Sequence, residues 1–133
     1  MPVWQRVRME PSGQPFNSIV QLEWEQGIPR NPVINAGAIL VADVLVSHYS
    51  ASKTAFLTFL RRLTGVETIY ADPLVYQSEL EHGNRNAAMA YLMKSFGNIE
   101  ADVPQVLEHY FYQCATAISC EQLARSLLFL ANR

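Results

Sequence analysis

Residues 32–48 read PVINAGAILVADVLVSH, and this stretch decides the fold of the chain. Within it, only Asn35, Asp43 and Ser47 interrupt a run of apolar and small residues before the closing histidine. A helix that is apolar on nearly every side is buried at the centre of a domain. We therefore predict a central buried helix from residue 32 to about residue 48. Asn35, near its start, must find hydrogen-bond partners or face a pocket.

Cap and stop signals on either side of this stretch predict further helices. Asn31 is a good cap for the central helix, and Pro32 suits its first position. Residues 16–25 are apolar but too short to distinguish a helix from a strand. The remaining predicted helices are 51–64 after Ser50, 73–82 after Asp72, one that starts at Asn84 or Asn86 after the break at Gly83 and runs to residue 96, 103–117 after Asp102, and 120–131 after Ser119 with its capping-box partner Gln122. The fold class is mainly α, and we expect residues 1–133 to form a single helical domain.

The composition describes a globular chain that is poor in charge. Half of its residues are apolar and 17% are charged, against about 25% in typical soluble domains. We expect another subunit, as in a homo-oligomer, or another part of the same protein to cover some of the surface. The net charge of −2 gives no basic surface for nucleic acid. No apolar run reaches the roughly 20 residues that span a membrane, and no apolar signal core opens the chain, so we expect a cytoplasmic protein.

The cysteines and histidines do not form a metal or redox motif. Cys114 and Cys120 lack zinc or redox spacing, and we expect two small buried thiols that are not bonded to each other. His48, His82 and His109 have no metal-ligand spacing, and we expect them to be solvated or to cap helices. Because no glycine-rich phosphate loop is present either, we expect no metal and no cofactor.

Four polar residues lie within apolar surroundings: Asn35, Glu79, Asn86 and Tyr110. A carboxylate, two amides and a phenol suit an amino-acid ligand, because the carboxylate can pair with an α-ammonium group. The amides can bind a carboxylate or a carboxamide. The alternative is that these side chains cap helices or are satisfied buried amides.

Several ordered blocks of the sequence resemble those of the serine-dependent glutaminases. The blocks are Glu10-Pro11-Ser12-Gly13 with Phe16-Asn17-Ser18, Pro29-Arg30-Asn31-Pro32 with Ile34-Asn35-Ala36-Gly37-Ala38, Ser78-Glu79 with Arg85-Asn86, residues 92–98, Tyr110-Phe111 with Cys114, and Ser119-Cys120-Glu121. They extend over nearly the whole chain.

The resemblance implies the helical part of a β-lactamase-like fold and an amidohydrolase that converts L-glutamine to L-glutamate and ammonia. It implies that Asn35, Glu79, Asn86 and Tyr110 contact glutamine. In the family, a Ser-x-x-Lys pair supplies the activated nucleophile, upstream of the Glu-Pro-Ser-Gly block. A second tyrosine and a sheet-forming segment lie downstream of the matching region. We therefore expect a fragment that contains substrate-binding residues, no catalytic residue and no α/β half.

One stretch matches the nucleophile motif by its letters alone. Ser50-Ala51-Ser52-Lys53 lies at a predicted helix start, outside the block in which the family has its pair. We interpret Ser50 as a helix cap and Lys53 as a surface lysine. A second function remains open, namely a non-catalytic helical module that binds a partner or oligomerises.

Overall fold

The computed structural model describes residues 2–131, which are mainly helical, as predicted. The helices are α1 (Val3–Arg6), α2 (Ile19–Trp24), α3 (Asn35–His48), α4 (Ser52–Thr64), α5 (Pro73–His82), α6 (Asn84–Ser95), α7 (Val103–Cys114), α8 (Cys120–Ser126) and the 3-10 helix η1 (Leu128–Leu130). Two short strands, β1 (Tyr70–Ala71) and β2 (Thr116–Ala117), pair antiparallel. That residues 1–133 form one domain stays a prediction.

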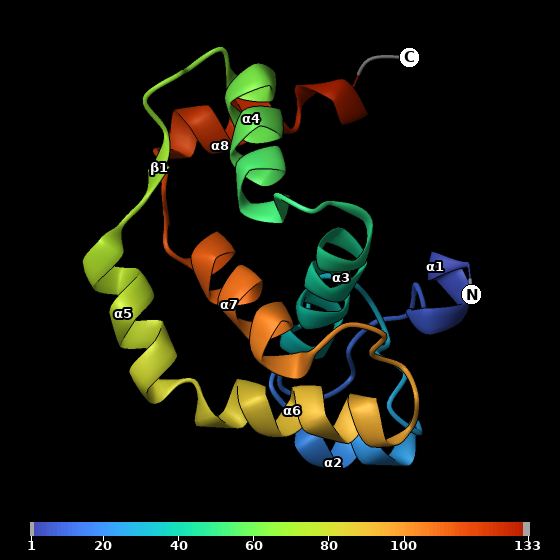
Figure 1. Ribbon diagram of the computed structural model, residues 1–133. Coiled ribbons are helices and arrows are strands. Elements are labelled where there is room, and N and C mark those ends of the chain that lie inside the picture. Colours follow the sequence, from blue (N-terminus) through green and yellow to red (C-terminus); the bar gives the residue numbers. More distant parts are fainter. Residues whose placement is uncertain (1, 132–133) are drawn as a thin grey trace.

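Helix α3 lies at the centre of the core, as the sequence predicts. It packs on α7 and α6, and α2 packs on α6 (Figure 1). The α3 side chains Ile39 and Leu40 are completely buried, and they share one cluster with Met89 and Met93 of α6 and Val106 of α7. Because α3 has neighbouring helices on several sides, nearly all of its faces are buried or half-buried, which explains its apolar composition.

A second group of elements lies at one end of the molecule, where α8 crosses behind α4 and packs against it (Figure 1). Strand β1 lies in the connection from α4 to α5, and β2 lies in the connection from α7 to α8. The two strands pair with Tyr70 opposite Ala117 and Ala71 opposite Thr116. Helix α5 leaves this ladder and packs along α7. It then turns at Gly83 into α6, so α5 and α6 are two helices and not one continuous helix.

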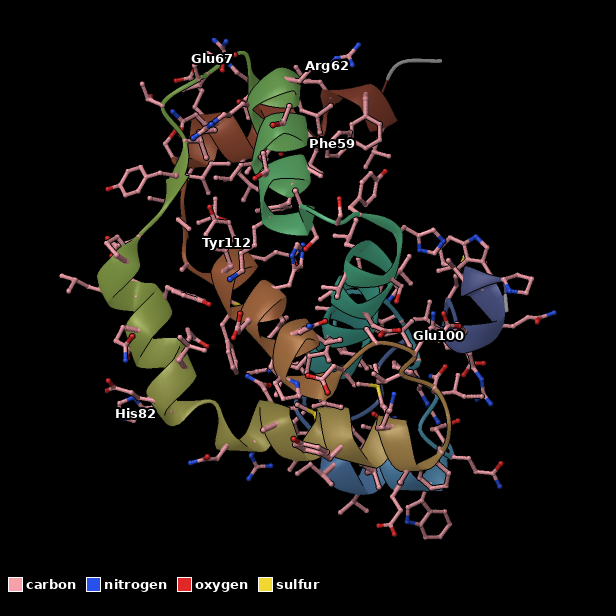
Figure 2. The ribbon with its side chains drawn as sticks, viewed as in Figure 1. Phe59, Arg62, Glu67, His82, Glu100 and Tyr112 are labelled. Carbon is pink, nitrogen blue, oxygen red and sulfur yellow. The ribbon has the colours of Figure 1, made fainter. Side chains whose placement is uncertain are left out.

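The aspartate in the middle of α3 is part of a buried polar network. Asp43 is completely buried and forms an ion pair with Arg6, which is 3% exposed. The Asp43 carboxylate also accepts hydrogen bonds from the backbone N–H groups of Glu100 (3.1 Å) and Ala101 (2.8 Å). Arg6 donates to the carbonyl of Asn98 at 2.8 Å. This network fixes the N-terminal segment and the α6–α7 loop to α3 (Glu100 is labelled in Figure 2).

The start of α3 differs from the prediction. The Asn31 side chain accepts hydrogen bonds from the backbone N–H groups of Val33 (3.0 Å) and Ile34 (3.1 Å). These bonds close a turn, and the helix begins only at Asn35. The turn lies tightly on the helix, because a Cβ at Gly37 would be 1.9 Å from the carbonyl oxygen of Asn31. Gly37 therefore allows the approach that positions Asn35.

Other helix ends confirm some signals and correct others. Asp72 caps α5 through the N–H groups of Leu74 and Val75, and Ser119 with Gln122 forms the predicted capping box of α8. The predicted caps by Ser50 and Asp102 are both wrong. Ala51 precedes α4, and among the described residues no side chain caps α4 or α7, although Asp102 does precede α7. Helix α7 ends at Cys114 rather than residue 117, since the following residues pair with β1.

Two predictions about individual side chains are also wrong. Cys114 and Cys120 are free thiols, but both are exposed rather than buried. His109 is neither solvated nor a cap, because it is 1% exposed, and neither ring nitrogen has a hydrogen-bond partner among the described residues. His48 and His82 are exposed, and their Nδ1 atoms lie 2.8 Å and 2.9 Å from backbone carbonyls one turn earlier.

Candidate substrate-binding site

Two of the predicted site residues are bonded to each other. Asn35, the first residue of α3, donates from its side-chain amide to the side-chain oxygen of Asn86 in the first turn of α6, at 3.0 Å. Both side chains are half-buried. No other hydrogen bond involves either side-chain amide within residues 2–131. The amino group of Asn86 and the carbonyl of Asn35 can therefore bind a ligand.

The other two predicted residues influence each other electrostatically. Tyr110 of α7 is 8% exposed, and burial raises the pKa of its hydroxyl well above the ordinary value. The neighbouring Cys114 thiol and, to a smaller extent, the Glu79 carboxylate raise this pKa further. Tyr110 is therefore a neutral phenol at neutral pH, able to donate a hydrogen bond.

Cys114, one helical turn after Tyr110, belongs to the same group of side chains. Partial desolvation raises the pKa of its thiol, and the negative charge of Glu79 raises it further. Glu79 is half-buried on α5. Its negative charge raises the pKa of both Tyr110 and Cys114.

Contacts on either side of Glu79 fix α5 against α7. One turn before Glu79, the rings of Tyr76 and Tyr112 meet edge to face with centroids 5.9 Å apart. One turn after it, Gly83 lies so close to α7 that an added Cβ would be 2.2 Å from Phe111 Cζ. Only glycine fits there without moving a buried phenylalanine. The turn at Gly83 thereby connects the helix of Glu79 to that of Asn86.

The structure thus bonds Asn35 to Asn86, and the negative charge of Glu79 contributes to the raised pKa of Tyr110. That all four side chains face one concave site stays a prediction. Three hollows of about 480 Å³ and one of about 400 Å³ have other residues in their walls. Within residues 2–131, no group of three His, Cys, Asp or Glu side chains could hold a metal ion.

The serine and lysine of the motif-like stretch line the 400 Å³ hollow beside α4. Lys53 is not a simple surface lysine, because its ammonium donates to the Tyr76 hydroxyl at 3.1 Å. His109 also lines this hollow, and it packs edge to face on Phe56. Burial and the nearby Lys53 charge lower the pKa of His109 to about 4. His109 is therefore neutral at neutral pH.

Sequence reasoning did not assign roles to Arg6 and Lys53. Arg6 lies 37 residues before its partner Asp43, and only the position of Asp43 inside an apolar helix signalled that a partner was required. Lys53 carried no comparable signal, since nothing near it in sequence shows that two tyrosines from other helices surround its ammonium.

Comparison with known proteins identifies the family. The family model described as glutaminase matches residues 1–133. The chain belongs to the glutaminase family. It is 58% identical over 131 residues to a glutaminase of Klebsiella pneumoniae subsp. pneumoniae, and 57% identical over 131 residues to one of Salmonella arizonae. Each alignment covers 98% of this chain and 42% of the relative, so the chain spans less than half the length of these glutaminases.

Solved structures of glutaminases share the fold. A probable glutaminase of Bacillus subtilis matches with a TM-score of 0.88 and 37% identity, over 97% of this chain and 42% of that one. The glutamate form of the protein Mglu matches with a TM-score of 0.81 and 26% identity, over 93% of this chain and 28% of that one. The chain therefore has the fold of the helical part of a β-lactamase-like glutaminase.

Proposed function

We propose that Asn35, Glu79, Asn86 and Tyr110 bind L-glutamine in a glutaminase. The observation that carries this proposal is the bond between Asn35 and Asn86, because it joins two of the predicted residues across 51 positions of sequence and leaves donors for a ligand. Glu79, whose charge raises the pKa of the buried Tyr110 hydroxyl, supplies the complementary charge. The similar protein Mglu has been solved in a glutamate form, which is consistent with an amino-acid ligand.

Each group has a role that its chemistry supports. The Glu79 carboxylate pairs with the α-ammonium of glutamine, an interaction that a neutral residue cannot replace. The Asn86 amino group retains two N–H donors for the α-carboxylate, since only its oxygen is used by Asn35. Tyr110 donates its hydroxyl proton without bringing a negative charge near the substrate. Together, these contacts distinguish an α-amino acid from a simple amide.

The proposed reaction is hydrolysis of the side-chain amide of L-glutamine. A serine oxygen of a Ser-x-x-Lys pair attacks the carboxamide carbon, and the serine proton is transferred to the departing nitrogen, which leaves as ammonia. Water then cleaves the acyl-enzyme ester and releases L-glutamate. This chain supplies the orientation of the substrate, and the nucleophile belongs to the part of the glutaminase that these residues do not include.

Calorimetric titration of the chain with L-glutamine tests the proposal. Glu79→Gln removes the charge that pairs with the α-ammonium, and Glu81→Gln is the matched control, because Glu81 is an exposed carboxylate on the same helix. We expect Glu79→Gln to weaken binding about 10- to 100-fold and Glu81→Gln to leave it unchanged. Equal affinity of the two variants, or no binding by the wild-type chain, would contradict the proposal.

We further propose that the glutaminase is a cytoplasmic homo-oligomer. Large apolar side chains are exposed on α2, where Trp24 is 84% exposed, and near the C-terminus, where Leu130 is 71% exposed. Surfaces of this kind are normally covered by protein. Within residues 2–131, no helix is long and apolar enough to cross a membrane. A sedimentation mass equal to one chain at micromolar concentration would contradict oligomerisation of this chain.

A further inference from the structure

Lys53 lies where three helices meet. It extends from the first turn of α4, and its Nζ atom is 5.1 Å from the ring centroid of Tyr76 on α5 and 5.5 Å from that of Tyr112 on α7. It donates a hydrogen bond to the Tyr76 hydroxyl at 3.1 Å and lies 3.6 Å from the Glu108 carboxylate. Figure 2 shows Tyr112 at the end of α7 that faces α4. One ammonium group therefore contacts side chains from both α5 and α7.

The contacts of Lys53 are linked to the proposed glutamine site through Tyr76, which lies on the same helix as Glu79. Tyr76 and Tyr112 touch edge to face, with an interplanar angle of 83°, and Lys53 lies close to both rings. A cation near an aromatic ring is attracted to its π face, and a hydrogen bond to the hydroxyl adds direction. Glu79 follows Tyr76 by three residues, so both lie on the same face of α5.

We propose that Lys53 is a positioning residue of the glutamine site, which holds α5 against α7 through Tyr76 and Tyr112 and thereby sets the place of Glu79. The inference rests on the proposed function of Glu79 in binding the α-ammonium of glutamine. It gives the lysine of the motif-like stretch a role other than activation of a nucleophile. Lys53 itself does not touch the substrate, because its neighbours are two phenol rings and a carboxylate of the protein.

The test compares Lys53→Met with Lys53→Arg. Methionine keeps much of the side-chain length but lacks the charge and the donors, whereas arginine keeps both and can stack on the tyrosine rings. Arg62→Met is the matched control, because Arg62 is an exposed cation on the same helix (Figure 2). The dissociation constant is measured for L-glutamine and for glutaramate, which has the same carboxamide chain but no α-ammonium group.

We expect Lys53→Met to weaken L-glutamine binding about tenfold, and Lys53→Arg to restore it to within about threefold of the wild type. Arg62→Met should bind glutamine as the wild type does. Glutaramate binding should be nearly the same in all four proteins, because it does not use Glu79. Equal loss of both ligands in Lys53→Met would indicate a general structural role and would overturn the proposal, as would unchanged glutamine affinity.

Hydrogen exchange separates this proposal from the proposed function. If the wild-type chain binds no glutamine, the proposed function is wrong, and the attachment of α5 is then judged by amide exchange in residues 73–82. Loss of the Lys53 contacts should accelerate exchange there in Lys53→Met and not in Lys53→Arg. Tyr76→Phe, which removes only the hydroxyl, should give a smaller change in the same direction. Unchanged exchange in all three variants would show that Lys53 does not hold α5.

Discussion

Replacement of Asp43 by asparagine is expected to cause a large loss of stability, because it leaves a buried arginine without its main partner. Asp43 is completely buried, and its carboxylate binds Arg6 and two backbone N–H groups. Removing one partner of a buried ion pair costs about 3–5 kcal/mol. Glu100 lies 3.3 Å from the other guanidinium nitrogen of Arg6 and compensates in part. We therefore expect Asp43→Asn to lower the free energy of unfolding by about 3 kcal/mol.

Urea unfolding followed by helical circular dichroism measures this loss. With a slope of about 2 kcal/mol per molar urea, the midpoint should fall by about 1.5 M. Asp102→Asn is the control, because Asp102 is exposed and its side chain caps no N–H group of α7. It should change the midpoint by less than about 0.3 M. Equal midpoints for Asp43→Asn and Asp102→Asn would refute the account of the buried network.

An apolar double replacement shows whether Asp43→Asn loses stability because the Arg6 charge is left unpaired or because hydrogen bonds are lost. Arg6→Met combined with Asp43→Leu removes both charges while retaining volume, and such exchanges are often neutral or stabilising. The double variant should therefore be more stable than Asp43→Asn. A double variant that is less stable would show that the hydrogen bonds to the α6–α7 loop matter more than the buried charge.

Three further outcomes follow from particular residues. His109 is neutral in the folded chain, with a pKa of about 4 against an ordinary value of 6.5, so only the unfolded state gains a proton as the pH falls from 6.5 to 4. The contribution of His109 to the free energy of unfolding should therefore decrease by about 3 kcal/mol over that pH window and stay constant above it. When the free energy of unfolding is measured by urea at each pH, His109→Phe should lack this pH-dependent loss. Gly83→Ala should cost about 1–3 kcal/mol through its clash with Phe111, and Phe111→Leu in the same chain should recover part of the loss in thermal unfolding. We expect the chain alone to release no ammonia from L-glutamine, because the resemblance to the family implies that the Ser-x-x-Lys pair lies upstream of the Glu-Pro-Ser-Gly block; release that disappears in Ser50→Ala would show that this serine is the nucleophile.

Local signals in the sequence predicted much of the fold. The apolar run of α3, the Asp72-Pro73 start of α5, the break at Gly83 and the capping box at Ser119 each act within a few residues. Such local signals can therefore be recognised in the sequence without knowledge of the tertiary structure. The β1–β2 ladder was not predicted, because two-residue strands whose paired residues lie 45 and 47 positions apart leave no periodic pattern.

Side-chain environments were harder to predict because they depend on tertiary contacts. His109 and Tyr110 are neighbours in sequence and both buried. The ring nitrogens of His109 have no hydrogen-bond partner within residues 2–131, whereas the pKa of Tyr110 is raised by burial and by Cys114 and Glu79. Lys53 was interpreted as a surface lysine, but α5 and α7 surround it with aromatic rings. The candidate site residues came from their polarity within apolar surroundings and from resemblance to the family, and the bond between Asn35 and Asn86 adds a geometric reason.

We propose that these helices present a site for L-glutamine, and amide NMR spectra of the isotope-labelled chain, recorded during titration with L-glutamine, show whether they do. We expect saturable shifts at the starts of α3 and α6 and around Glu79 and Tyr110, with loss of saturation in Glu79→Gln and wild-type behaviour in Glu81→Gln. Shifts that do not saturate, or that persist unchanged in Glu79→Gln, would contradict it.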